Sequence, residues 1–516
     1  MKKRKKLLRL VFGRTTFVVL FLLIQVGILL MGFAWLEEYM LYFYGASVIL
    51  SAVTLIYIIS ADESTSIKLS WVVPILVFPV FGTLFYLFVR LQIGTKLIGH
   101  RIRMTSAETA PYLKQDTETA ARFNEMSSSQ GNLVRYMNRF AGCPVYQNTA
   151  AQYFPLGDDM FVEMKRRLKA AKHFIFMEYF IVERGEMWNS ILEILEEKVK
   201  EGVEVRVMYD GMCCLMLLPY SYPKTLQEKG IKCKMFSPIR PALSTHQNNR
   251  DHRKICVIDG HTAFTGGVNL ADEYINKKVR FGHWKDTAVM VEGDAAVGFT
   301  MMFLQMWGVT EQEKEHYERY LKPADYQLPA NTDASGFVIP YGDSPLDKEN
   351  VGEQVYLDIL GHAKKYVHIM TPYLILDDQM INAIQYSAKR GVETVIIMPH
   401  IPDKMSAYLL ARSYYEELLT AGVRIFEYTP GFVHGKVFTC DDEKAVVGTI
   451  NLDFRSLYLH FECAAYFYKH PVVARVEDDY QKTLEKCQEI TIADCRNFPF
   501  FKRFMGKALR LFAPLM

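Results

Sequence analysis

Three long apolar stretches occupy the first ninety residues, and the remaining chain alternates short apolar runs with amphipathic segments. The apolar stretches span residues 16–35, 40–60 and 71–89. The first two have the length of about twenty residues that a bilayer-spanning helix requires. A cleavable signal peptide would have a shorter apolar core followed by a small-residue cleavage site. The pattern therefore predicts an N-terminal α-helical membrane region.

The third apolar stretch differs from the others because it contains Pro74, Pro79 and Gly82 and is followed by basic residues. Proline and glycine at mid-depth fit a broken or re-entrant segment. Basic residues beside an apolar segment favour the cytoplasmic side of the membrane. We therefore expect a multi-pass cell-membrane protein with two full spans and a kinked third segment. The remaining domains are expected on the cytoplasmic face.

Beyond residue 150 the chain alternates β-rich and helical patterns, which is typical of an α/β fold. The same order of elements occurs twice and predicts a duplicated domain. The expected strands are 174–182, 203–209 and 231–236, then 366–371, 392–398 and 423–428, with helices at 188–201 and 377–390. The expected parts are a membrane region (1–103), a linker with a short helix (104–150), two repeated domains (151–325 and 335–495) and a basic amphipathic tail (496–516).

The two repeats carry the same motif, H-x-K-x4-D, and in both an asparagine follows the histidine by seventeen residues. A single copy would be weak evidence, because a surface strand with a solvated lysine explains it equally well. Two copies with one spacing indicate a site shared by both repeats. The residues are His252, Lys254, Asp259 and Asn269 in the first copy and His434, Lys436, Asp441 and Asn451 in the second.

The residue types of the motif suit the chemistry of a phosphate ester. One imidazole can attack phosphorus, the other can protonate the leaving oxygen, and the lysines and asparagines can hold the phosphoryl oxygens. This set needs neither a metal nor a cofactor, and we expect neither. A carboxylate should orient the attacking histidine. Asp286 and Glu462, each at the start of a later strand, are the candidates, although such a carboxylate can also simply cap a strand end.

We expect each histidine to share a strand face with its lysine, because residues i and i+2 of a strand point the same way. Asp259 and Asp441 lie at an odd offset from their histidines. They are therefore expected to order the strand ends without touching substrate.

Composition and charge limit the classes of partner that the protein is expected to bind. The net charge is only +3, so the chain is not a polycation of the kind that binds nucleic acid. Nine cysteines without a C-x2-C pair indicate reduced thiols and no zinc site of that type. Residues 500–512 alternate aromatic and basic positions at helical spacing, which predicts an interfacial helix suited to anionic lipid. A terminal helix packed on the protein's own core is the alternative.

The motif segments resemble the phospholipase D superfamily and, within it, the bacterial cardiolipin synthases. The resemblance rests on Asn249–Lys254, Thr265–Asn269, Gly448–Ser456 and the apolar N-terminal segments. One departure is His460, where the family pattern leads us to expect Asn. The resemblance implies two phospholipase D-like domains, with mixed sheets flanked by helices and a pseudo-twofold axis, after the membrane region.

The same resemblance implies an activity. A phosphatidyl group would pass from one phosphatidylglycerol to another through a phosphatidyl-histidine, with His252 as nucleophile and His434 as general acid and later base. The expected partners are phosphatidylglycerol and anionic membrane lipid, without nucleic acid, and a homo-oligomer is left open. A hydrolytic phospholipase D, another phosphatidyltransferase, a nucleic-acid phosphodiesterase and a non-catalytic membrane scaffold are the alternatives.

Overall fold

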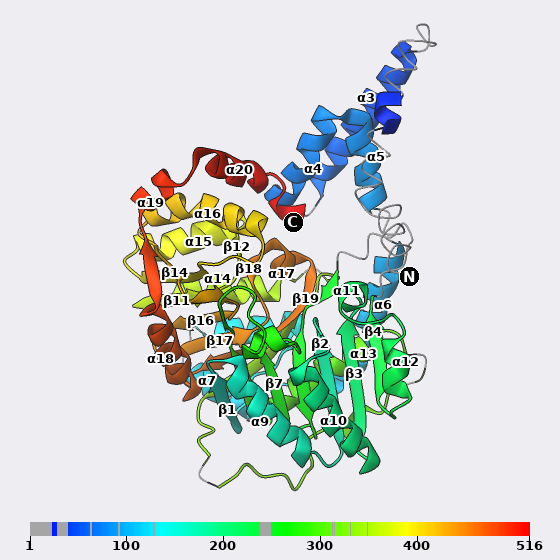
Figure 1. Ribbon diagram of the computed structural model, residues 1–516, viewed down its shortest axis with the longest axis vertical. Helices are drawn as coiled ribbons and strands as arrows, with labels where there is room; N and C mark the ends of the chain where they lie inside the picture. Colours follow the sequence, from blue (N-terminus) through cyan, green and yellow to red (C-terminus); the bar gives the residue numbers. More distant parts are fainter. Residues whose placement is uncertain are drawn as a thin grey trace. The chain divides into compact units, whose positions relative to one another are not determined.

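The computed structural model (Figure 1) describes residues 23–27, 40–61, 64–90, 93–126, 130–237, 249–311, 313, 315–330, 332–347 and 349–515. The chain divides into two compact units. The first consists of Met1–Leu97, Ile239–Asn248 and Ala508–Met516, and the second of Ile98–Pro238 and Asn249–Lys507. The predicted span at 16–35 lies outside the described residues except for 23–27, which are helical.

The first unit contains the helices α3 (Met40–Ser60), α4 (Thr65–Val77) and α5 (Pro79–Arg90). Within the part of the chain that is described, α3 is the one helix long and apolar enough to cross a membrane. The third apolar stretch is broken at Phe78, directly before a proline, as its composition predicts. The two short helices pack closely, because a Cβ on Gly82 would lie 2.7 Å from the Ile75 Cα.

Residues 104–150 are more ordered than the expected linker with one short helix. They contain the end of α6 (Ile93–Thr109), a 3₁₀ turn (Ala110–Tyr112), α7 (Thr117–Met126) and α8 (Gly131–Ala141). The polar residues of this segment favour a linker when the sequence is read alone, but in the structure they form the solvent-facing surfaces of helices. In α8, for example, Leu133, Val134 and Met137 are buried while the polar positions between them are not.

The second unit contains two large mixed sheets with the same strand order (Figure 1). The first sheet runs β1 (Thr149–Phe154), β9 (Ala288–Gly293), β7 (Thr262–Gly266), β6 (Lys254–Ile258), β2 (Phe174–Tyr179), β3 (Glu204–Asp210) and β4 (Lys232–Phe236). The second runs β10 (Phe337–Asp343), β19 (His460–Tyr468), β17 (Lys444–Gly448), β16 (Val437–Cys440), β11 (Tyr366–Met370), β13 (Glu393–Pro399), β14 (Arg424–Tyr428) and β20 (Cys487–Ile490). The first seven positions correspond one to one, which confirms the predicted α/β fold and its duplication.

Helices flank both sheets. The larger ones are α9 (Gly157–Ala170), α10 (Glu186–Lys200) and α13 (Ala296–Gly308) in the first half, and α14 (Val351–His362), α15 (Asp378–Lys389), α16 (Met405–Thr420) and α18 (Val472–Leu484) in the second. Shorter helices are α11 (Cys213–Met216), α12 (Tyr222–Gln227), α17 (Phe454–Tyr458) and α19 (Ile492–Asn497), and α20 (Phe500–Arg510) follows them. The predicted strands and helices therefore form within a few residues of their expected bounds.

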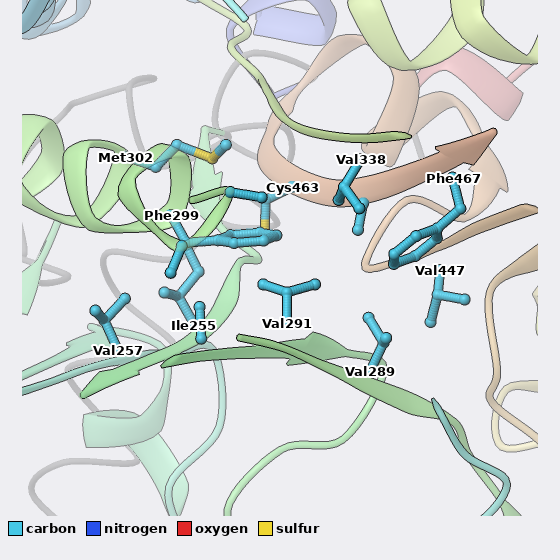
Figure 2. Packing of buried hydrophobic residues seen from close by; sticks show 14 of the residues in the cluster. Ile255, Val257, Val289, Val291, Phe299, Met302, Val338, Val447, Cys463 and Phe467 are labelled. Atoms are coloured by element: carbon cyan, nitrogen blue, oxygen red, sulfur yellow. The ribbon is translucent and has the colours of Figure 1, made fainter. Parts of the chain in front are cut away.

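The two halves share one apolar core, which is why they form a single unit. Figure 2 shows Ile255 and Val291 of the first sheet and Phe299 of α13 packed in one cluster with Val338 and Phe467 of the second sheet. Burial of these side chains removes apolar surface from water on both sides of the boundary and so stabilises the halves together. The shared core therefore joins the two sheets directly.

Candidate active site

A short parallel ladder joins the first motif to the second half. β5 (Arg250–Asp251) pairs with the first residues of β19, and Asp251 lies opposite Phe461. The next residue along the two strands is therefore His252 on one side and Glu462 on the other. His252 Nδ1 lies 2.9 Å from Glu462 Oε1 and 3.0 Å from Oε2. Both residues are buried.

The second motif repeats this arrangement with the halves exchanged. β15 (Gly431–Val433) pairs in parallel with β8 (His283–Lys285). His434 and Asp286 follow directly, and His434 Nδ1 lies 2.6 Å from Asp286 Oδ2. The two carboxylates identified in the sequence thus contact the motif histidines, and each one comes from the opposite half.

The expected strand geometry around the motifs is wrong. β6 begins at Lys254 and β16 at Val437, so both histidines precede the strand. At each histidine the chain leaves the ladder with the other half and enters its own sheet, which interrupts the strand alternation. Each lysine still lies beside its histidine, because Lys254 donates to the His252 carbonyl oxygen and Lys436 to that of His434.

Burial sets the protonation of the two histidine–carboxylate pairs. Desolvation lowers the pKa of His252 well below its ordinary value and lowers the pKa of His434 to about 4, where the nearby Lys436 acts in the same direction. Burial alone would raise the pKa of Glu462, but the contact with His252 outweighs it and holds that pKa well below its usual range. Both imidazoles are therefore neutral, and Glu462 is ionised, near neutral pH.

The two lysines have unusually low proton affinity. Desolvation lowers the pKa of Lys254 to about 8 and that of Lys436 to about 7, although neighbouring carboxylates oppose the shift. Lys436 Nζ also lies 2.9 Å from His434 Nδ1. An anionic phosphate placed between these groups would favour their charged forms.

The motif aspartates lie at strand ends, as expected. Asp259 and Asp441 both have a positive φ, 51° and 56°. The carboxylate of Asp259 accepts hydrogen bonds of 2.7–2.9 Å from the backbone N–H groups of Lys172, His173 and Phe174. That of Asp441 accepts bonds of 2.7–3.0 Å from Lys364, Lys365 and Tyr366. Each carboxylate thus anchors the start of the adjacent strand.

The two asparagines differ in their surroundings. Asn269 Oδ1 accepts a hydrogen bond of 3.0 Å from the Ile181 N–H, and its Nδ2 donates to the Tyr274 hydroxyl at 2.8 Å. Asn451 Oδ1 is buried and has no hydrogen-bond partner among the described residues. Asn269 therefore supports the loop after β2 and keeps one amide hydrogen, and a phosphate contact by either asparagine stays a prediction.

Several rings at the site were not identified from the sequence as site residues. Phe180 lies edge-on to His252, with ring centroids 5.0 Å apart, and Tyr274 lies edge-on to His434 at 5.5 Å. The His460 ring is 5.5 Å from that of His252. The departure from the family pattern at His460 was a visible signal, whereas isolated aromatic residues give none.

Within the described residues, one group of side chains could hold a metal ion, and it consists of His252, His460 and Glu462. Sequence spacing did not reveal this group because two of its members follow the first by about two hundred residues.

Two halves of equal topology that meet at paired histidine–carboxylate contacts define a site of the phospholipase D class. A family model described as "Cardiolipin synthase, PLD-like domain" matches residues 164–307 and 356–484, and a "Phospholipase_D-nuclease N-terminal" model matches residues 49–90. The chain belongs to the cardiolipin synthase family of the phospholipase D superfamily.

Individual relatives agree with this assignment. An uncharacterized protein of Streptococcus mutans is 49% identical over 90% of this chain and 99% of its own length. The cardiolipin synthase of Alkalihalophilus pseudofirmus is 34% identical over 87% of this chain and 88% of its own. A phosphatidylserine synthase from Haemophilus influenzae covers 76% of this chain and all of its own with a TM-score of 0.57, and at 14% identity it supports the fold alone.

Proposed function

We propose that the protein is a cardiolipin synthase that transfers a phosphatidyl group from one phosphatidylglycerol to a second and releases glycerol. Family membership supports the reaction class. The single observation that carries the mechanism is the crossed pair of contacts, His252 with Glu462 and His434 with Asp286. These contacts bring two buried imidazoles with low pKa values together with two buried lysines, and such a set suits double displacement at phosphorus.

His252 is the nucleophile in this proposal. Its Nδ1 faces both oxygens of Glu462. An ionised carboxylate only accepts hydrogen bonds, so Nδ1 carries the ring proton and Nε2 keeps its lone pair. Nε2 forms a bond to phosphorus, the bond from phosphorus to the glycerol oxygen breaks, and the glycerol oxygen takes a proton. The product of this step is a phosphatidyl-histidine.

His434 is the acid and base. Its Nδ1 contacts both Asp286 and the ammonium group of Lys436, so its protonation responds to the charge beside it. A bound phosphodiester anion raises the pKa of His434 from the value of about 4 in the free enzyme. The protonated imidazole protonates the leaving glycerol. It then takes the proton from a hydroxyl of the second phosphatidylglycerol, whose oxygen displaces His252.

The proposal includes attachment to a membrane, with the second unit on the cytoplasmic face. The apolar helix α3 supports attachment, and α20 supports contact with anionic lipid. In α20, Phe501 and Phe504 are 82% and 63% exposed, and lysine and arginine residues lie between the aromatic positions. The helix packs on α16 through Gly506, where a Cβ would lie 2.4 Å from the Leu409 carbonyl oxygen. This arrangement favours an interfacial helix over one buried on the core.

The activity is tested with purified protein and phosphatidylglycerol in detergent micelles that contain EDTA. Cardiolipin and free glycerol in equal amounts support the transferase. Phosphatidic acid as the sole phosphorus-containing product would replace the proposal with a hydrolase, and no turnover of phosphatidylglycerol would overturn both.

Contact of α20 with lipid is tested by fluorescence quenching in vesicles whose acyl chains are brominated. Phe504→Trp is expected to add quenched fluorescence to that of the five native tryptophans. The control is Val162→Trp, a 67% exposed position on α9, which lies at the opposite end of the second unit in Figure 1. Equal quenching of the two added tryptophans would refute the docking of α20.

A further inference from the structure

His460 is a buried side chain at the active centre for which the proposed reaction has no role. It is 9% exposed, and neither ring nitrogen has a hydrogen-bond partner in the described part of the chain. A buried polar atom without a partner costs about 1–3 kcal/mol. Such an atom in a native protein calls for an explanation, and one explanation is an ion or ligand that binds there.

The position of His460 directs it toward the nucleophile. It lies two residues before Glu462 on β19, so the two side chains project from the same face of the strand. His460 Nδ1 lies 3.8 Å from Glu462 Oε1, and His252 Nδ1 lies 2.9 Å from the same oxygen. One potential ligand atom of each residue lies within 4.8 Å of the other two.

This donor set matches a known preference among metal ions. Two imidazoles and one carboxylate, with a fourth position for water, form a common zinc site with bond lengths of about 2.0–2.2 Å. Tetrahedral bonds of that length place the ligand atoms about 3.3–3.6 Å apart. The separations of 2.9 Å and 3.8 Å lie on either side of this value. The third separation, between the donor atoms of His252 and His460, is at most 4.8 Å, so the two imidazoles must also move toward each other to complete the site.

We propose that His252, His460 and Glu462 bind a divalent transition-metal ion of the Zn²⁺ type, and that the bound ion inhibits the enzyme. The metal site is independent of the reaction catalysed, whereas the inhibition rests on the proposed function. The ion takes the lone pair of His252 Nδ1, so the ring proton moves from Nδ1 to Nε2. Nε2 is the atom proposed to attack phosphorus, and a protonated Nε2 has no lone pair for that attack. Metal binding and attack on phosphorus therefore exclude one another.

Two charges, one on a ligand and one on a neighbouring side chain, set the strength of the site. Glu462 is fully buried, so its negative charge attracts the ion strongly. The ammonium group of Lys254, bound to the His252 carbonyl oxygen, repels it. We therefore expect reversible binding that a chelator removes, in contrast to the permanent occupancy of structural zinc sites.

The test uses tag-free, full-length protein in detergent, treated with EDTA and desalted. Zn²⁺ binding is measured by equilibrium dialysis, and phosphatidylglycerol turnover is measured in parallel. The wild type is expected to bind one Zn²⁺ with loss of activity that EDTA restores. His460→Asn is expected to need more than about tenfold higher Zn²⁺ for half-saturation and for half-inhibition, since a ligand is lost. Each protein is compared with its own metal-free activity.

His316→Asn is the matched control, because His316 is exposed, with 62% of its side chain accessible, and makes one ion pair with Glu318. It should behave as the wild type. The cysteines are the same in all three proteins, so zinc bound by thiols appears equally in each. Equal binding and inhibition in the wild type and His460→Asn would overturn the site. One-ion binding lost in His460→Asn, together with absence of turnover in the wild type, would support the site and refute the function.

Discussion

The two halves of the active centre have the same topology but hold their histidines differently. Among the described residues, His252 Nδ1 contacts only the carboxylate of Glu462, so a single tautomer is stable. His434 Nδ1 lies between Asp286 and the ammonium group of Lys436, and it cannot donate to one and accept from the other at the same time. A duplicated fold can thus fix one imidazole for attack while the other remains able to exchange a proton.

The residue between histidine and lysine adds to this asymmetry. In the first motif it is Arg253, whose guanidinium donates to the backbone carbonyl oxygens of Met302, Asp343 and Glu462. In the second motif it is Gly435, where a Cβ would lie 3.0 Å from Met370 Sδ. Arg253 therefore ties the strand of Glu462 to the first half, and the second motif has neither this tie nor the space for it.

The largest expected effect is the loss of either histidine. His252→Ala and His434→Ala are each expected to lower cardiolipin formation by more than about 10³-fold, because each removes a group that makes or breaks a bond. The readout is the rate in micelles at equal amounts of folded protein. Activity within tenfold of the wild type in either variant would contradict a two-histidine mechanism.

Replacement of the two carboxylates should have the next largest effect, and it separates the roles of the two histidines. Glu462→Gln is expected to lower the rate by about 10²- to 10³-fold, because the amide can donate to Nδ1 and stabilise the wrong tautomer of His252. In single-turnover experiments this loss should appear in glycerol release. Asp286→Asn should slow glycerol release and cardiolipin formation alike, and equal patterns in the two variants would remove the distinction between the halves.

A smaller effect is expected on the pH profile. The pKa of Lys436 is lowered to about 7, so its positive charge is lost as the pH rises through that value. The kcat/KM of the wild type should therefore fall on the alkaline side. In Lys436→Arg the side chain keeps its charge at every accessible pH. The alkaline limb of the kcat/KM profile should therefore lie at higher pH in this variant, even if the maximal kcat/KM is lower. An unshifted limb would show that Lys436 does not control it.

The smallest effect on turnover is expected at the motif aspartates. Asp259→Ala and Asp441→Ala each remove an acceptor of three backbone N–H groups, which should lower the free energy of unfolding by about 2–4 kcal/mol. Asp259 is the more buried and should have the larger effect. The readouts are the denaturation midpoint and the activity per folded molecule. A loss of specific activity without a loss of stability would place these residues in the chemistry.

Much of the fold could be predicted from the sequence, because apolar periodicity reports which face of an element is buried. The strands from 174 to 236 and from 366 to 428 formed close to their expected positions. Residues 104–150 did not, since exposed helix faces and linkers have similar polar composition. The prediction that each motif histidine lies within a strand was also wrong. At His252 the chain leaves the ladder with the second half, and that ladder depends on a strand that begins at His460, far along the chain.

The residues of the site could be predicted from the sequence, but which carboxylate contacts which histidine could not. Their place at the start of a later strand identified both carboxylates, but the crossing of Glu462 to His252 follows from the register of β5 against β19. The occupied side chain of Asn269 and the unpartnered nitrogens of His460 depend on three-dimensional contacts that the order of residues does not encode.

The most direct test of the central claim is to locate the covalent intermediate. Wild-type protein is quenched in acid within one turnover of labelled phosphatidylglycerol, raised to alkaline pH to preserve phosphoramidates, digested and sequenced by mass spectrometry. We expect a phosphatidyl group on His252. A phosphatidyl group on His434 in its place would contradict the assignment of nucleophile and acid to the two halves.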